Sequence, residues 1–283
     1  MKTPMTPLAY RGDGASGPTH LPLPPARSGL VRGRRLRKQW RYVGVWGEAV
    51  SICAARVTVG PVPQEFWAVW DRDLGKLHEH TRLRAGRVGM TPGRVRVRDG
   101  DNRLDLRFEE DPTTAIEVMT PVPGGWTWTR KQIATCTGSA MLAGRRVPVD
   151  GLALIDDSDG YHPRSTHWWW SAGTAALPDG RTAAWSVVVG INDTMPAIEN
   201  TLWIDGRPQP IGPVSFLPDL SGVEFADGAV LTFTPESERA SRVDLLVISS
   251  VYRQPFGTFT GTLPGGYEVS SGYGVMEDHR ALW

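Results

Sequence analysis

The chain has 283 residues, of which 31 are Lys or Arg and 30 are Asp or Glu, giving a formal net charge of +1. This length is enough to bury a large core, and the balanced charge excludes a global field that would attract nucleic acid or an anionic membrane. The two cysteines, Cys53 and Cys136, are far apart and form no CxxC motif, so they require neither an oxidising compartment nor a metal knuckle. We therefore expect a reduced, cytoplasmic setting and no nucleic-acid partner.

The first thirty residues are rich in Pro and Gly and show no hydrophobic periodicity, which predicts a mobile arm over residues 1–30. They contain no apolar run that could form the core of a signal peptide, and no apolar stretch of about 18 residues occurs anywhere in the sequence. We therefore expect a soluble chain with no integral membrane segment.

From Leu36 onward, short runs of β-branched and aromatic residues alternate with turn signals. Asp-Gly pairs, which favour tight hairpin turns, stand at 99–100, 150–151, 159–160, 179–180, 205–206 and 227–228. Candidate strands lie at 40–46, 66–70, 94–98, 103–108, 182–190, 229–234 and 243–252. The pattern predicts an all-β chain with little helix, built from antiparallel barrel or sandwich units. Dense turn signals on both sides of Asp150-Gly151 predict one domain over 31–150 and a second over 151–283.

The segment 156–203 holds an unusual concentration of tryptophans and lone ionisable side chains. If 166–172 is extended, His167, Trp169 and Ser171 share one face of the strand, and Trp168 and Trp170 take the other. The turn at 179–180 then returns the chain through 182–193. This geometry could place His167, Trp169 and Asp193 over one apolar cavity.

An acid enclosed by tryptophans can perform general acid catalysis, because burial disfavours its charged form and raises its pKa. The same rings would stabilise a developing carbocation through their π faces. The candidate catalytic residues are Asp193, His167 and Glu199. The alternatives are structural: Asp193 as a turn cap, His167 as a core histidine, and Glu199 as a residue that closes a turn.

A second group of residues is predicted to bind the ligand or to support the site. Rings at interior strand positions are what an apolar cavity needs. The candidate ligand-binding residues are Trp168, Trp169, Trp185, Trp203 and Tyr273, and the candidate supporting residues are His162, Arg164, Glu277 and His279. We expect the closing segment 271–283 to be an integral strand that brings Glu277 or His279 near the loop at 162–164, with Trp283 packed against the barrel.

Motifs of other enzyme classes are absent from the sequence. It contains no GxSxG, GxxxxGK[ST] or HExxH pattern, so hydrolase and kinase functions lose their usual support. His78 and His80 could share a strand face, but no third metal ligand is suitably spaced. We expect neither a cofactor nor a metal.

Several motifs resemble a bacterial family known only as a domain of unknown function. They are DGYHPR (159–164) leading into HWWW (167–170), GIND (190–193), ENTLW (199–203), GTF (257–259) and GYGVMEDH (272–279). The resemblance covers about residues 20–283 and extends, more distantly, to the tandem lipocalin-like proteins that include carotenoid 1,2-hydratase. It implies two packed lipocalin-like β-barrel domains, and it places the hydratases' His-x-Trp pair on His167 and Trp169 and their acid on Asp193.

Two functions remain open. The first is binding of an apolar, lipid or isoprenoid-like small molecule in an aromatic-lined cavity, with acid-catalysed hydratase, isomerase or cyclase chemistry and no cofactor. The second is a non-catalytic, lipocalin-like carrier or sensor of such a molecule. A buried acid without a salt-bridge partner would favour the enzyme, and an apolar lining would favour the carrier.

Overall fold

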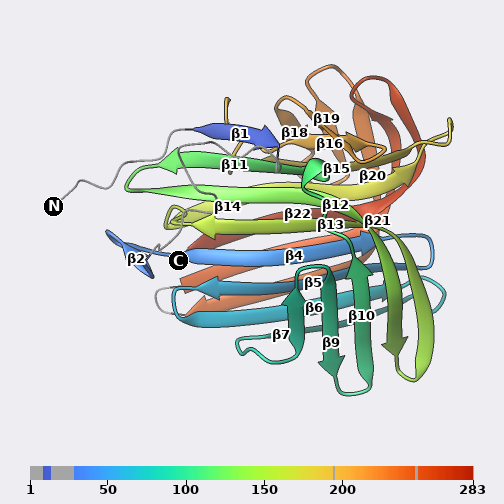
Figure 1. Ribbon diagram of the computed structural model, residues 1–283, viewed down its shortest axis with the longest axis horizontal. Helices are drawn as coiled ribbons and strands as arrows, with labels where there is room; N and C mark the ends of the chain where they lie inside the picture. Colours follow the sequence, from blue (N-terminus) through green and yellow to red (C-terminus); the bar gives the residue numbers. More distant parts are fainter. Residues whose placement is uncertain (1–8, 14–28, 194, 246–247, 283) are drawn as a thin grey trace.

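The computed structural model describes residues 9–13, 29–193, 195–245 and 248–282. Nearly all of them belong to antiparallel strands, and the only helix in the described ranges is the short 3-10 turn η1 (Pro112–Thr114). The strands form two large antiparallel sheets (Figure 1). The predicted all-β fold class is confirmed.

The first sheet follows the order β7-β6-β5-β4-β13-β12-β10-β9-β8, with β11 paired to β12 and β1 paired to β11. Its strands are β1 (Tyr10–Asp13), β4 (Lys38–Trp46), β5 (Val50–Val59), β6 (Val62–Asp71), β7 (Lys76–Arg82), β8 (Val88–Thr91), β9 (Arg94–Asp99), β10 (Asn102–Phe108), β11 (Ala115–Val122), β12 (Gly125–Leu142) and β13 (Arg145–Gly160). A separate short pair is formed by β2 (Val31–Arg32) and β3 (Arg35–Leu36).

The second sheet follows the order β17-β16-β15-β14-β22-β21-β20-β19-β18. Its strands are β14 (Ser165–Ala176), β15 (Thr182–Val189), β16 (Thr201–Ile204), β17 (Arg207–Pro210), β18 (Val214–Phe216), β19 (Gly222–Phe225), β20 (Val230–Leu245), β21 (Ile248–Leu263) and β22 (Tyr267–Leu282). The closing segment is thus the central strand β22, which pairs with β14 on one side and β21 on the other. Trp283 lies outside the described residues.

The chain passes from the first sheet to the second between Gly160 and Ser165. Strand β13 runs through Asp150-Gly151, and the division of the chain into domains at that pair stays a prediction. Within the N-terminal segment 1–30, residues 10–13 form β1 on the edge of the first sheet. Residues 1–8 and 14–28, which carry the rest of the predicted arm, lie outside the described residues.

Strand alternation divides the apolar side chains into separate cores. On β4, Val43 and Val45 pack into the core of the first sheet, whereas Tyr42 and Trp46 face the second sheet. On β14, Trp169 packs against the core of the second sheet, whereas Trp168 and Trp170 face the first. A third core therefore lies between the two sheets, and its members come from both, including Ile133 and Leu154 from the first and Ala172, Phe256 and Val275 from the second.

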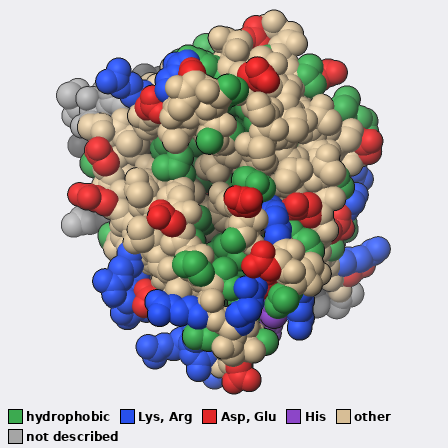
Figure 2. Space-filling view, turned by 90° about the vertical axis from the view of Figure 1, so that its right-hand side faces the viewer, with side chains coloured by type: hydrophobic (Ala, Val, Ile, Leu, Met, Phe, Trp, Pro, Cys, Tyr) green, Lys and Arg blue, Asp and Glu red, His purple; other side chains and the backbone are tan. Residues whose placement is uncertain are grey.

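The outer surface carries charges of both signs. On the face in Figure 2, Asp and Glu side chains are spread widely, and Lys and Arg gather toward the lower part. This mixture fits the net charge of +1. The informative charges are the few that lie inside, between the sheets.

Candidate functional site

The carboxyl group of Glu277 is buried between the two sheets. Its Oε1 accepts a hydrogen bond from the Trp168 indole N–H at 2.8 Å, and its Oε2 accepts one from Gln254 Nε2 at 2.9 Å. No ion pair joins it to a cation within the described ranges. Burial raises the pKa of Glu277 to about 7, although the bond from Trp168 works in the opposite direction. This acid can therefore hold a proton near neutral pH.

The sequence of β22 explains the position of this acid. Tyr273, Val275, Glu277 and His279 are two residues apart, so they share the face of β22 that is turned to the first sheet. Trp170 is the register partner of Glu277 across the β14–β22 pair, and Trp168 is the partner of His279. The two rings thus cover the acid from the neighbouring strand.

Arg239 of β20 is a second buried charge in this interface. Its guanidinium lies 3.8 Å from the ring centre of Phe66 and 4.8 Å from that of Tyr252, which is cation–π geometry. Its Nη2 donates to Thr81 Oγ1 at 2.9 Å, and its Nε lies 3.5 Å from Glu79. Because Phe66 and Thr81 belong to the first sheet, Arg239 joins the two sheets beside the acid.

Several polar atoms around Glu277 and Arg239 lack hydrogen bonds. Within the described part of the chain, no hydrogen-bond partner is found for Arg239 Nη1 or Gln254 Oε1, both of which are buried. Folded proteins rarely leave such groups unpaired, because each costs the desolvation of a polar atom. A cluster of unpaired donors and acceptors beside a buried acid is what a site for a polar ligand group would present.

His279 completes the cluster at its far end. Its ring centre lies 4.2 Å from that of Trp168 and 5.1 Å from that of Tyr252, and its Nε2 lies 2.9 Å from Ser250 Oγ. Burial, with the charge of Arg239, lowers the pKa of His279 to about 3. The lowered pKa favours the neutral imidazole, so Glu277 rather than His279 is the group of this cluster that can hold a proton near neutral pH.

A second buried cluster surrounds Lys131 of β12. Its Nζ lies 2.5 Å from Asp156 Oδ2 and 3.1 Å from Glu199 Oε1. Asn192 Nδ2 donates to Glu199 Oε2 at 2.8 Å, and Thr127 donates to Asn192 Oδ1 at the same distance. Burial disfavours the Lys131 ammonium, but the two carboxylates outweigh it and hold its pKa above the ordinary value.

The two clusters are electrostatically connected. Burial raises the pKa of Glu199; the charge of Lys131 lowers it, and the charge of Asp156 raises it further. The charge of Asp156 also raises the pKa of Glu277. The Trp170 ring lies between them, 5.8 Å from Lys131 Nζ and 5.4 Å from the ring centre of Tyr42. The interface therefore holds two clusters of polar groups inside an apolar core, on either side of the Trp170 ring.

The three candidate catalytic residues lie in different surroundings. Asp193 is in the loop after β15, where its Oδ2 accepts from the Gly190 backbone N–H at 2.7 Å. His167 is half-buried and lies 2.8 Å from Asp278. Glu199 reaches the interface but is paired with Lys131. The catalytic roles of the three residues stay predictions.

The predicted ligand-binding rings divide between two cores. Trp168 and Trp203 lie between the sheets, and Trp185 and Trp169 belong to the core of the second sheet, which apolar side chains fill. Tyr273 lies at the edge of the interface. Among the supporting residues, the rings of His162 and Trp40 are 4.9 Å apart, and Arg164 is exposed.

The residues that sequence reasoning missed are Lys131, Asp156, Arg239, Tyr252, Tyr42 and Gln254. Two of them carry a signal that could have been used. Lys131 shares a strand face with Ile133, and Asp156 shares one with Leu154, so a charge interrupts an apolar alternation at each point. Arg239 lies in a polar stretch of β20 and carries no such signal, because its burial depends on the partner sheet.

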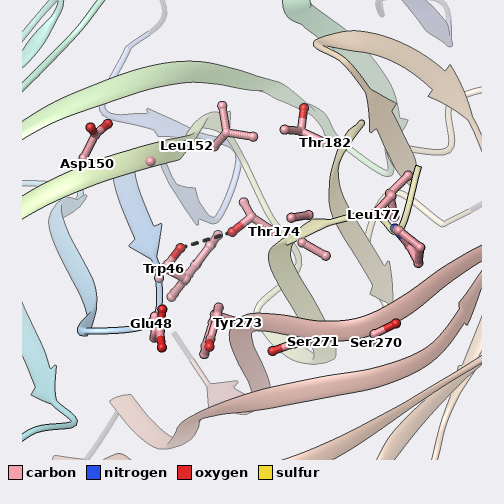
Figure 3. A pocket seen from close by; sticks show the side chains of 15 residues that line it. Trp46, Glu48, Asp150, Leu152, Thr174, Leu177, Thr182, Ser270, Ser271 and Tyr273 are labelled. Atoms are coloured by element: carbon pink, nitrogen blue, oxygen red, sulfur yellow. Dashed lines mark hydrogen bonds between the residues drawn. The ribbon is translucent and has the colours of Figure 1, made fainter. Parts of the chain in front are cut away.

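A groove opens at one end of the interface, where β4, β13, β14 and β22 meet (Figure 3). Its volume is about 630 Å³, and Trp46, Glu48, Asp150, Leu152, Thr174 and Tyr273 are among the residues that line it. Thr174 Oγ1 donates to the Trp46 carbonyl at 3.2 Å, which links the two sheets in the groove wall. Tyr273 is the predicted ligand-binding residue that lines it.

Among the described residues, no group of three or more His, Cys, Asp or Glu side chains is arranged to hold a metal ion. In the same part of the chain, no helix has the length and apolar character needed to cross a membrane.

The sequence matches the family model described as "Domain of unknown function (DUF2804)" over residues 94–283, which is more than half of the chain. The chain belongs to the DUF2804 family. The matched region of this DUF2804 protein runs from β9 to β22 and includes Lys131, Arg239 and Glu277. The expected membership of a family of unknown function is confirmed. No curated protein sequence matches the chain.

Two solved structures are similar to this DUF2804 protein in fold. Kievitone hydratase from Nectria haematococca is 11% identical, with a TM-score of 0.55, and the match covers 88% of this chain and 89% of that one. CghA with Sch210972 is 10% identical, with a TM-score of 0.44, over 87% of this chain and 88% of that one. The expected resemblance to lipocalin-like hydratase proteins is confirmed at the level of the fold.

Proposed function

We propose that this protein is a cofactor-independent lyase or isomerase that acts on an apolar small molecule held between its two sheets, with Glu277 as the general acid. One observation carries the proposal: a buried carboxyl group without an ion-pair partner lies among polar atoms that lack hydrogen bonds. A structural acid in such a place would be paired, as Glu199 is with Lys131.

Each group has a defined role in this chemistry. Glu277 donates its proton to a carbon or oxygen of the bound molecule, and the faces of Trp168 and Trp170 stabilise the positive charge that develops. Arg239 Nη1 donates to an oxygen of the substrate. In a hydration, water adds to the cation and its proton returns to the Glu277 carboxylate. In an isomerisation, the carboxylate removes a proton from a neighbouring carbon instead.

The fold supports this assignment as an analogy. Kievitone hydratase, which shares the fold, is named for a hydration reaction, and the same fold here brings an acid to the interface of two sheets. The interface is the preferred location for the ligand because it holds the buried Glu277 carboxyl group and the unpaired polar atoms around it. The interior of the second sheet is filled by apolar side chains, including Trp185 and Phe259.

The test is native mass spectrometry of the protein purified from cells, comparing the wild type with Glu277→Gln. The variant keeps the acceptor for Trp168, and Gln254 can turn its unpaired Oε1 toward the new amide. We expect the variant to retain substrate and the wild type to retain product or a mixture, differing by one water for a hydratase and by retention time alone for an isomerase.

The matched control is Glu224→Gln, which changes an exposed carboxylate on β19. It should retain the same molecules as the wild type. The same ligand, in the same amount and form, on the wild type and on Glu277→Gln would show a carrier rather than an enzyme.

A further inference from the structure

Arginines are concentrated on the outer surface of the first sheet. The valines of β9 and the leucines of β10 are buried in the core of that sheet, so the residues that alternate with them point outward. The same alternation turns Arg146 outward on β13, next to buried Val147. The outward positions of these three strands hold six arginines, here called the arginine face: Arg94, Arg96, Arg98, Arg103, Arg107 and Arg146.

Most of this positive charge is not neutralised within the protein. Asp105 Oδ2 lies 2.6 Å from Arg94 Nη2 and 3.8 Å from Arg96 Nε. The other four arginines of the face form no ion pair within the described ranges. The one further carboxylate that points outward from these strands is Asp150. Although the whole chain has a net charge of only +1, six cations on this face are thus set against two anions.

Two of the arginines stand at positions that oppose each other. Arg98 and Arg103 are register partners in the antiparallel pair of β9 and β10. Like charges directly opposite each other destabilise a sheet, whereas an opposite charge stabilises it, as Asp105 does opposite Arg96. An anion that lay over both guanidinium groups would relieve the repulsion between Arg98 and Arg103.

The uncharged part of the face restricts the kind of anion. The remaining outward positions on β8, on β13 and on the part of β12 that pairs with β10 are small, polar or aliphatic: Gly89, Thr91, Thr137, Ser139, Met141 and Pro148. Single-stranded nucleic acid binds by stacking its bases on aromatic rings, and duplex DNA is read by an element that enters a groove. These positions offer neither, so the face is suited to a surface of anionic groups.

The loop between β7 and β8 adds an exposed apolar side chain next to the arginine face. The backbone N–H of Arg98 donates to the Arg87 carbonyl at 3.0 Å, which joins the end of this loop to β9. Leu83, in the same loop, is 57% exposed and stands between Arg82 and Arg84 in the sequence. Arginines beside an exposed leucine fit the surface of an anionic bilayer, where the charges contact head groups and the leucine enters the apolar region.

We propose that the arginine face and the loop 83–87 form a peripheral binding surface for an anionic phospholipid bilayer. The surface lies on the outside of the first sheet, whereas Glu277 lies between the two sheets. Membrane binding therefore does not require the chemistry of Glu277. If that chemistry takes place, the surface brings the protein to the phase in which apolar molecules dissolve.

Vesicle co-sedimentation tests this surface, with vesicles of phosphatidylcholine alone and of equal parts phosphatidylcholine and phosphatidylglycerol. We expect the wild type to bind the anionic vesicles at low salt, to lose most of this binding at high salt, and not to bind the neutral vesicles. Arg98→Gln with Arg103→Gln should weaken binding by roughly 10- to 30-fold. The same variant should keep or raise the melting temperature, because it removes a like-charge pair.

Two further variants test the same surface from other directions. Asp105→Asn removes the acid that pairs with Arg94 and Arg96, so it should strengthen binding to anionic vesicles by roughly 2- to 5-fold. Leu83→Ser should weaken vesicle binding and leave the salt dependence unchanged, because it removes an apolar contact and no charge.

The matched control is Arg207→Gln with Arg242→Gln, which removes the same charge from exposed positions on β17 and β20 of the second sheet. It should bind anionic vesicles as the wild type does. Equal weakening by the two double variants would show that net charge alone is responsible and would overturn the assignment, as would a wild type that binds neither kind of vesicle. Tighter binding to a duplex DNA oligonucleotide than to anionic vesicles at the same salt would replace the bilayer with nucleic acid.

Discussion

Glu277 on β22 accepts a hydrogen bond from the indole N–H of Trp168 on the neighbouring strand β14, with the two heavy atoms 2.8 Å apart. The bond fixes one carboxyl oxygen, and the other is fixed by Gln254 on the strand at the opposite side of β22. The acid is thus held by its own sheet and faces the other one. A rigid acid that faces a second surface is suited to act on a molecule placed between the two.

The stability of the protein should depend on pH through Glu277. Its pKa is raised from 4.5 to about 7, so its contribution is fully present below pH 4.5 and is lost as the pH rises through 7. The full difference is on the order of 3 kcal/mol. Urea unfolding at pH 5 and pH 8 should show the wild type losing stability relative to Glu277→Gln as the pH rises. A pH-independent difference between the two proteins would contradict the prediction.

Removing the ammonium of Lys131 should be costly, because it would leave the buried carboxylates of Asp156 and Glu199 without the cation with which both form ion pairs. We expect Lys131→Met to lower the free energy of unfolding by about 3–5 kcal/mol, measured by urea denaturation. Adding Asp156→Asn and Glu199→Gln to the same variant should restore much of the loss. Lys76→Met, at an exposed position on β7, is the control and should change stability little.

Gly44 provides the space in which the Trp46 ring lies. A Cβ built at Gly44 would be 2.3 Å from Trp46 Cζ2, so an alanine there must displace the ring. We expect Gly44→Ala to cost about 1–3 kcal/mol of stability and to alter near-UV circular dichroism. Gly47→Ala is the matched control, since the nearest atom to its Cβ is 3.9 Å away. Similar losses for both variants would show that the ring is not the cause.

Strand β22 should be indispensable for folding. It pairs with β14 over 165–175 and with β21 over most of its length, so its removal leaves two unpaired edges in the middle of a sheet. Deletion of 271–283 should abolish soluble folding, as judged by soluble expression and far-UV circular dichroism. A truncated protein with the melting temperature of the full chain would show that the strand is not needed.

The all-β fold class could be predicted from the sequence, because strand alternation and Asp-Gly turns are local signals. The opposite faces of Trp168 and Trp169 on β14 follow from that alternation alone. The site depends on which strand faces meet across the interface, and no local signal carries that information. Glu277 was identified only as a supporting residue, and Arg239 was missed, because the burial of each depends on the contact of two sheets.

Arg239 and Glu277 together make the proton on the acid sensitive to whether the two halves are in contact. Arg239 is hydrogen-bonded to Thr81 on β7 of the first sheet, and it lies beside an acid whose pKa burial raises to about 7. Any separation of the sheets that let water reach Glu277 would lower its pKa toward 4.5 and release the proton at neutral pH. Contact between the two sheets would therefore favour the protonated acid, and exposure to water would favour the carboxylate.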